Sequence, residues 1–250
     1  MDTGSLYIIA TPIGNLEDIT YRAVRILKER VDVVFCEDTR QSLKLLNHYN
    51  ISVPVQSLHA HSPDSKIERI VGMLQNGKSV AYVTDSGTPG ISDPGSRLIE
   101  RARAGGVTTI PVPGPSALAA LISVSGFHGK NILFTGFTGK KESKQRNELL
   151  KLKEFSGMIV LYESPYRIKK LIGVINEVFP GSMILIGREM TKIYEEFIYG
   201  SSGDLLQHIE DITEKGEFAV AIFNDLKQKK SHVNAQKTER DSITSCRKTK

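Results

Sequence analysis

Two adjacent carboxylates and an arginine follow an apolar run near the start of the chain, in Cys36-Glu37-Asp38-Thr39-Arg40. A carboxylate at a strand end can take a proton from a hydroxyl group, and an arginine can orient that carboxylate or a phosphate. A structural role is the alternative, in which Glu37 and Asp38 cap the next helix and pair with Arg40. The sequence leaves both roles open.

Two further charged segments follow apolar runs in the second half of the chain. One is Tyr162-Glu163-Ser-Pro-Tyr-Arg167, and the other is Arg188-Glu-Met-Thr191-Lys192. Each could be an isolated surface cluster. Their shared position directly after a predicted strand favours a binding site.

Three loops rich in Gly and Pro also follow apolar runs, at Thr11–Leu16, Asp85–Gly95 and Val112–Ala117. Glycine lets the backbone approach a ligand closely, and proline stiffens a loop. One such loop is as well explained by a turn. Three of them at the carboxyl ends of parallel strands favour a ligand cleft, because open α/β sheets bind ligands there.

Three weaker patterns bear on phosphate, metal and nucleic-acid binding. Gly72–Ser79 matches G-x-x-x-x-G-K-[ST], but a helical pattern precedes it and a strand follows, the reverse of a phosphate-binding loop. We expect Gly77 to end that helix. His59 and His61 share one face of an extended chain without a third ligand at metal spacing, so we predict no metal. The segment Gly136–Arg146 is basic and holds Phe137, which suits either contact with a phosphate backbone or a solvated helix start.

Strand-like and helix-like segments alternate along the chain, which predicts an α/β fold. In the first half the alternation indicates a mostly parallel sheet covered on both faces. The pattern resets near Pro113–Ser116, so we predict two α/β domains, 1–113 and 114–226. The expected strands are Leu6–Ala10, Val31–Cys36, Val55–Leu58, Val80–Thr84, Thr108–Val112, Ile132–Thr135, Met158–Tyr162, Met183–Ile186, Glu195–Tyr199 and Ala219–Phe223.

The charge is concentrated in the remaining 24 residues of the 250-residue chain. Segment 227–250 holds eight Lys or Arg and two Asp or Glu, so the net charge of +5 comes from this tail. Its composition predicts disorder, and it is either a solvated terminus or an electrostatic arm for a polyanion such as RNA. No apolar run approaches the ~18 residues of a membrane span. Without a signal-peptide pattern or a disulfide framework from Cys36 and Cys246, we expect a cytoplasmic protein.

Six segments in this order identify a resemblance over Leu6–Asn224. They are T-P-I-G-N-L-x-D-I-T, E-D-T-R, D-S-G-T-P-G-I-S-D-P-G, P-x-P-G-P-S-A, Y-E-S-P-Y-R and R-E-M-T-K. Together they resemble the branch of the tetrapyrrole-methylase superfamily that methylates 16S ribosomal RNA with S-adenosylmethionine (SAM). The resemblance implies two α/β domains with a cofactor cleft between them and a homodimer.

The implied reaction is methyl transfer from SAM to the ribose 2′-hydroxyl of a cytidine in the decoding region of 16S rRNA. The segments assign to the cofactor Pro12, Gly14, Asp85, Gly87, Thr88, Pro89, Ile91, Ser116, Ala117, Tyr162, Arg188 and Thr191. For the base that assists the hydroxyl we expect Glu37 or Asp38 first and Glu163 next, with Arg40 orienting a carboxylate or a phosphate. Tyr162, Tyr166 or Phe137 are candidates for stacking on a base.

Two other functions stay open. A small-molecule methylase of the same fold is one, although tetrapyrrole methylases typically carry G-x-G-P-G-D where this chain has Thr11-Pro-Ile-Gly-Asn15. That departure favours RNA. A non-catalytic RNA-binding module is the other. Family members often continue into a small C-terminal region, which the basic tail could replace electrostatically.

Overall fold

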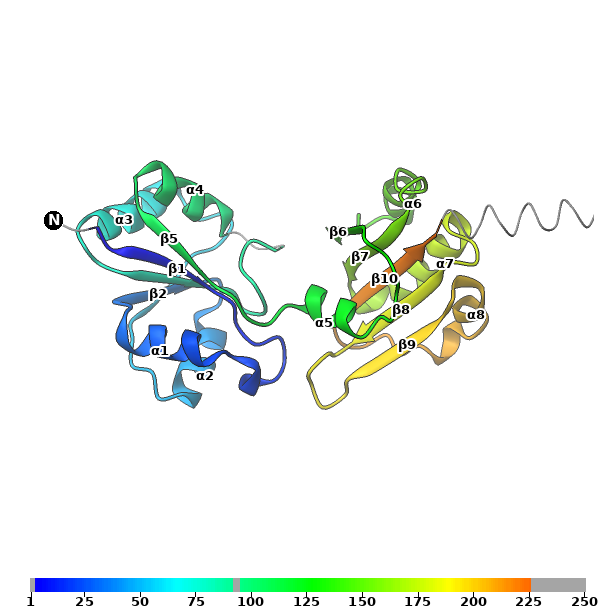
Figure 1. Ribbon diagram of the computed structural model, residues 1–250, viewed down its shortest axis with the longest axis horizontal. Helices are drawn as coiled ribbons and strands as arrows, with labels where there is room; N and C mark the ends of the chain where they lie inside the picture. Colours follow the sequence, from blue (N-terminus) through cyan, green and yellow to red (C-terminus); the bar gives the residue numbers. More distant parts are fainter. Residues whose placement is uncertain (1–2, 92–94, 226–250) are drawn as a thin grey trace, which may run out of the picture. The chain divides into compact units, whose positions relative to one another are not determined.

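A computed structural model of the chain describes residues 3–91 and 95–225, in two compact units (Figure 1). Unit 1 contains the chain up to Ala120 together with Glu189–Glu195, and unit 2 contains Leu121–Arg188 and the chain from Glu196. The predicted boundary at 113/114 and the predicted cleft stay predictions. The basic tail and Asp93-Pro94 lie outside the described residues.

Unit 1 is built on a five-stranded parallel sheet of order β3-β2-β4-β1-β5. The predicted alternation of strands and helices is confirmed, with boundaries that differ by a few residues. In chain order the elements are β1 (Ser5–Ile9), a 3-10 turn (Leu16–Asp18), α1 (Tyr21–Glu29), β2 (Val33–Cys36), α2 (Thr39–His48), β3 (Val55–Ser57), α3 (Asp64–Gln75), β4 (Val80–Val83), α4 (Ser96–Ala104) and β5 (Thr108–Val112).

Helices cover both faces of this sheet, with α3 and α4 on one side and α1 and α2 on the other (Figure 1). Tyr82 and Phe35 are fully buried toward α3 and α4, whereas Val34 and Ala81 lie in the second core beneath α1 and α2. Burial on both faces explains the continuous apolar runs of β2 and β4. Because both faces are buried, polar side chains of these strands can reach solvent only at the strand ends.

The turn after α3 accounts for the false phosphate-loop pattern. Asn76 is the C-cap of α3, and Gly77 follows it with a φ of 86°. The N–H of Lys78 bonds the carbonyl of Met73, which closes the helix end before β4 begins at Val80. The expected order of helix, glycine turn and strand is therefore confirmed.

Unit 2 has a mixed sheet of order β6-β7-β10-β8-β9. Strands β6 and β7 are parallel, while β10 runs antiparallel to both of its neighbours. The α5 helix (Ala117–Ser123) links the units, and the other elements are β6 (Ile132–Phe137), α6 (Glu142–Leu150), β7 (Gly157–Glu163), a 3-10 turn (Pro165–Arg167), α7 (Ile168–Val178), β8 (Met183–Arg188), β9 (Glu196–Ser201), α8 (Ser202–Gln207), a second such turn (Ile209–Asp211) and β10 (Phe218–Asn224).

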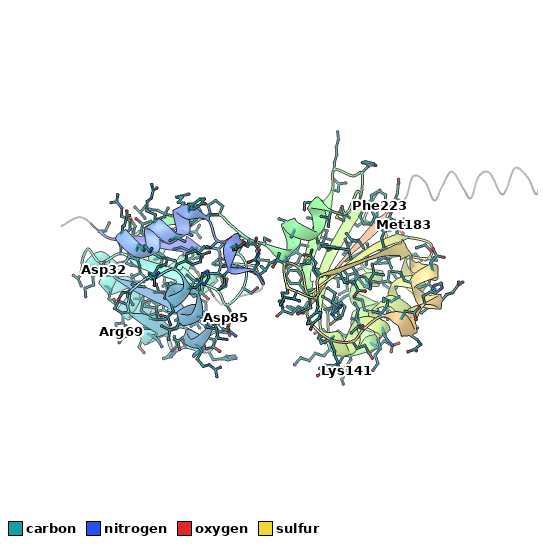
Figure 2. The ribbon with its side chains drawn as sticks, turned by 90° about the horizontal axis from the view of Figure 1, so that it is seen from below. Asp32, Arg69, Asp85, Lys141, Met183 and Phe223 are labelled. Carbon is teal, nitrogen blue, oxygen red and sulfur yellow. The ribbon has the colours of Figure 1, made fainter. Side chains whose placement is uncertain are left out.

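The strand directions in unit 2 bring the two predicted charged segments to one edge of the sheet. Because β7 and β8 both run against β10, Glu163 and Arg188 each pair with Phe218, from opposite sides. The start of β8, at Met183, and the end of β10, near Phe223, lie at the opposite edge. Figure 2 shows both residues on the other side of the unit from Lys141. One apolar core, with Leu149, Leu171 and Leu205 from the three helices, covers one sheet face.

The described residues contain no helix long and apolar enough to cross a membrane. Over the same residues, no group of three or more His, Cys, Asp and Glu side chains gathers as metal ligands would.

Candidate functional site

The first two Gly/Pro loops of unit 1 are joined directly by their backbones. Thr11 and Gly87 form an antiparallel bridge, with N–H to carbonyl distances of 2.9 and 3.0 Å. The Thr11 hydroxyl donates to the carbonyl of Thr84 at 3.0 Å, and the Thr84 hydroxyl donates to the carbonyl of Gly87 at 2.8 Å. All three residues are buried, so these bonds fix the loops at the carboxyl edge of the sheet.

The third loop joins the same edge. The Thr88 hydroxyl donates to the carbonyl of Pro115 at 2.9 Å, and the N–H of Ala10 donates to the carbonyl of Val112 at 3.2 Å. Gly87 has a φ of 83°, and a Cβ placed there would lie 3.5 Å from Ile13. The expectation that three separate loops meet at one edge is therefore confirmed.

A segment from the second half of the chain completes this part of unit 1. Glu189–Glu195 packs on the first loop, where the N–H of Asn15 donates to the Thr191 hydroxyl at 3.1 Å. A Cβ on Gly14 would lie 2.4 Å from the Lys192 side chain and 3.0 Å from the Met190 carbonyl. Only glycine fits there without a rearrangement of the Glu189–Glu195 segment against the first loop.

That segment holds an unusual backbone conformation. Glu189 and Thr191 have φ values of 50° and 66°, in the left-handed region that residues with a Cβ seldom adopt. Local bonds hold the shape, because the N–H of Thr191 donates to Glu195 at 2.6 Å and Lys192 pairs with Glu189 at 2.9 Å. Strained backbone of this kind concentrates at ligand sites.

Asp38 is the N-cap of α2 and forms an ion pair with Arg40. Its side chain accepts from the N–H of Arg40 at 2.9 Å and pairs with the Arg40 guanidinium at 2.6 Å. The hydrogen bond from the Arg40 side chain lowers the pKa of Asp38 from 3.8 to about 2. The N–H of Asp38 itself donates to the Asp85 carboxylate at 2.9 Å.

Glu37 differs from Asp38 in both exposure and hydrogen bonding. Its side chain is exposed, and it makes no hydrogen bond or ion pair with any residue that the structure describes. Cys36 before it is fully buried, and this burial raises the pKa of its thiol. Of the two adjacent carboxylates, Glu37 is thus the one whose side chain no described residue binds.

Glu163 in unit 2 is a buried carboxylate with every acceptor site in use. One oxygen accepts from the Thr138 hydroxyl at 3.0 Å and from the Gln145 amide at 2.6 Å. The other accepts from the N–H of Ser164 at 2.7 Å and pairs with Arg167 at 2.5 Å. The Glu163 side chain has no exposed surface. Four donors therefore occupy both carboxylate oxygens of Glu163, which leaves no free acceptor site facing a substrate.

The remaining predicted residues of unit 2 lie along the same sheet edge. The Arg188 guanidinium pairs with Glu196 at 2.7 Å. The ring of Tyr162 lies between those of Phe134 and Phe137, at centroid distances of 4.9 and 5.7 Å. These contacts leave Phe137 59% exposed at the end of β6.

Most of the predicted site residues fall into two groups, one in each unit. Sequence interpretation did not single out the residues whose side chains hydrogen-bond within each group, Thr11 and Thr84 in unit 1 and Thr138 and Gln145 in unit 2. The three threonines come one or two residues after an apolar strand, where a hydroxyl can bond a neighbouring loop. Gln145 gave no signal, because it stands in a polar helix with no apolar periodicity. The predicted residues in unit 1 are Glu37, Asp38, Arg40, Pro12, Gly14, Asp85, Gly87, Thr88, Pro89, Ile91, Ser116, Ala117 and Thr191, and those in unit 2 are Tyr162, Glu163 and Arg188.

The unit 1 edge fits the chemical groups of SAM. The exposed carboxylate of Asp85 can accept from an ammonium or a ribose hydroxyl, and Gly90 has a φ of 88° with nothing within 4 Å of a Cβ placed there. Figure 2 shows Asp85 on the opposite side of unit 1 from Asp32, which precedes β2. The acidic side chain of Asp85 therefore lies at the carboxyl edge of the sheet.

Comparison with known proteins supports the fold first. A cobalt precorrin-4 methyltransferase of cobalamin biosynthesis superposes with a TM-score of 0.66 at 19% identity, covering 88% of this chain and 94% of that one. The uroporphyrin-III C-methyltransferase of Thermus thermophilus gives 0.60 at 17% identity, covering 88% and 94%. The family profile of the Tetrapyrrole (Corrin/Porphyrin) Methylases matches residues 5–206.

Curated relatives are much closer in sequence. The ribosomal RNA small subunit methyltransferase I of Leptospira biflexa is 43% identical over 221 residues, which cover 88% of this chain and 91% of the relative. The proteins of that name from Borrelia garinii and Thermotoga maritima are 45% and 42% identical and are covered over 97% and 98% of their length. The chain belongs to the tetrapyrrole methylases, and within them to the family of ribosomal RNA small subunit methyltransferase I.

Proposed function

We propose that this chain is a SAM-dependent methyltransferase that methylates the ribose 2′-hydroxyl of a cytidine in the decoding region of 16S rRNA. The observation that carries the proposal is the bonded set of loops at the carboxyl edge of unit 1, built from the segments that resemble this family. The names of the close relatives support the substrate class. A cytoplasmic homodimer is part of the proposal, and the mass in solution tests the dimer.

SAM supplies an electrophilic methyl group when it is bound. In this proposal Asp85 and the loops that carry Gly14, Gly87 and Gly90 would hold it, and Tyr162 and Arg188 stay candidates by family resemblance. The protein must also bind the hydroxyl nucleophile and accept its proton. A ribose hydroxyl is a weak nucleophile, so a carboxylate near it assists the transfer.

The three candidate carboxylates are not equivalent for that role. Glu37 is exposed and unpaired among the described residues, whereas Asp38 is tied to Arg40 with a pKa of about 2. Glu163 is enclosed by four donors. We therefore assign the proton acceptor to Glu37 and positioning roles to Asp38 and Glu163.

The test incubates the protein with methyl-labelled SAM and, separately, with small and large ribosomal subunits lacking this modification. We expect label in the RNA of the small subunit alone. Label in the large subunit, or in neither, contradicts the proposal.

A small-molecule methylase of the same fold is the second candidate, because the solved structures that superpose are named for porphyrin and precorrin substrates. A parallel assay with a porphyrinogen distinguishes it. Transfer to the porphyrinogen and not to the ribosomal subunit would favour this second function.

A further inference from the structure

We infer that the edge of unit 2 where β6 and β7 end is a contact surface for single-stranded RNA. The inference rests on the proposed function, because it names where that RNA substrate is gripped. Its exposed members come from two short segments, one after each strand. They are Phe137, Lys140, Lys141, Lys144 and Tyr166.

Two aromatic side chains of this edge are exposed. Phe137 is 59% exposed and Tyr166 is 81% exposed. The rings of Phe137 and Tyr162 pack in a T-shaped arrangement with centroids 5.7 Å apart, and this contact leaves much of Phe137 exposed. Exposed rings of this kind stack on unpaired bases, and every base has a face to offer.

Three lysines follow Phe137 closely in the chain. Lys140, Lys141 and Lys144 are exposed, and none of them forms an ion pair with a described residue. Arg146 differs, because Glu142 and Glu177 both pair with it. Unpaired lysines next to exposed aromatics suit a phosphate backbone with splayed bases.

The two segments are fixed to each other by buried Glu163. Its carboxylate binds Thr138, directly after Phe137, and on its other oxygen the N–H of Ser164 and the side chain of Arg167, on either side of Tyr166. Gln145 braces both Thr138 and Glu163, at 2.7 and 2.6 Å. A rigid surface loses less conformational entropy on binding than a mobile one.

The loop that carries the lysines is held to α6 as well. The N–H of Gly139 donates to Glu148 at 2.9 Å, and the stem of Lys144 packs where a Cβ on Gly139 would lie. The charged ends therefore project from a fixed backbone. Glu163 acts through these neighbours, as a positioning residue.

Binding is tested by fluorescence anisotropy with a labelled single-stranded RNA of about ten nucleotides. The full chain is used, so that the basic tail is common to all variants. We expect Phe137→Ala and Tyr166→Ala each to weaken binding about tenfold, from the loss of one stacked base. The double variant K140E/K141E should lower the slope of log affinity against log salt by about one.

Matched controls come from unit 1. Tyr21, which is 97% exposed, is replaced by Ala, and the exposed Lys28 and Lys78 are replaced by Glu. These variants should bind RNA as the unsubstituted chain does. Equal losses in test and control variants would overturn the inference, as would a loss of SAM affinity in place of RNA affinity.

Steady-state kinetics separates positioning from catalysis. We expect Glu163→Gln to raise KM for the small subunit several-fold and to leave the pH profile of kcat unchanged. Loss of the acidic limb of that profile would make Glu163 the base and overturn its positioning role. If the unsubstituted chain methylates the subunit and all surface variants match it, the inference fails while the proposed function stands.

Discussion

The backbone N–H of Asp38 donates a hydrogen bond of 2.9 Å to the carboxylate of Asp85. This bond ties the segment after β2 to the loop after β4, the neighbouring strand of the sheet. It holds the exposed Glu37 beside the loops that we assign to SAM. The candidate base and the candidate cofactor loop are thus fixed by one side chain.

Glu37→Gln should lower kcat by about 10²–10⁴-fold, because a positioned carboxylate contributes that much when it accepts a proton. Asp38→Asn should retain most of the activity, since an asparagine can still cap α2. Single-turnover methyl transfer to the small subunit measures both. If Asp38→Asn is the more damaging variant, the roles are reversed.

The charge of Asp38 should stabilise the fold only above acidic pH. Its pKa falls from 3.8 to about 2 on folding, so the ionised form is favoured in the folded state. That stabilisation is complete above the ordinary value and is lost as pH falls toward the folded value.

Urea unfolding of the unsubstituted chain and of Asp38→Asn, from about pH 7 to about pH 2.5, measures this effect. The difference in the free energy of unfolding should stay constant at neutral pH and shrink below about pH 4. A difference independent of pH would show that Arg40 does not stabilise the carboxylate.

Gly14→Ala should disturb the contact between the first loop and Glu189–Glu195. The added Cβ would lie 2.4 Å from the Lys192 side chain, 2.7 Å from the Thr191 hydroxyl and 3.0 Å from the Met190 carbonyl, so this tight contact must rearrange. We expect a loss of about 1–3 kcal/mol in the free energy of unfolding and weaker SAM binding by calorimetry.

Gly72→Ala is the matched control for that change. Gly72 lies in α3 with nothing within 4 Å of the added carbon. This variant should gain about 0.5–1 kcal/mol and keep its SAM affinity. Similar behaviour of the two variants would rule out close packing at Gly14.

Cys36 should resist alkylation while the chain is folded, because it is fully buried and burial raises the pKa of its thiol. A Cys246→Ser background leaves one thiol to count. Iodoacetamide at mildly alkaline pH should label it only after denaturant is added. Rapid labelling of the folded chain would contradict the packing of β2.

The sequence predicted the elements of both units well, because apolar runs and helical spacing survive in strands such as β4 and helices such as α7. Strand direction was harder. The run that becomes β10 gives no sign that it pairs antiparallel between β7 and β8. Direction depends on how the chain connects through space, which local periodicity does not record.

The sequence indicated where in the fold the candidate site residues lie, and it said less about how they interact. Loops at strand ends were recognised because Gly and Pro stand out at Gly87 and Pro89. The carboxylates were ambiguous, since the sequence of Glu37 and Asp38 does not say which one meets Arg40. Their roles depend on hydrogen bonds across the fold, as at Glu163, where the partner Gln145 is 18 residues away.

The central claim is methyl transfer to a ribose of the small-subunit RNA. Mapping of 2′-O-methyl positions after incubation with SAM tests it most directly, with Glu37→Gln as the inactive control. We predict one new 2′-O-methyl group, on a cytidine of the decoding region, that is absent with the control. A methyl group on a base, on another region, or undiminished by Glu37→Gln would contradict the account.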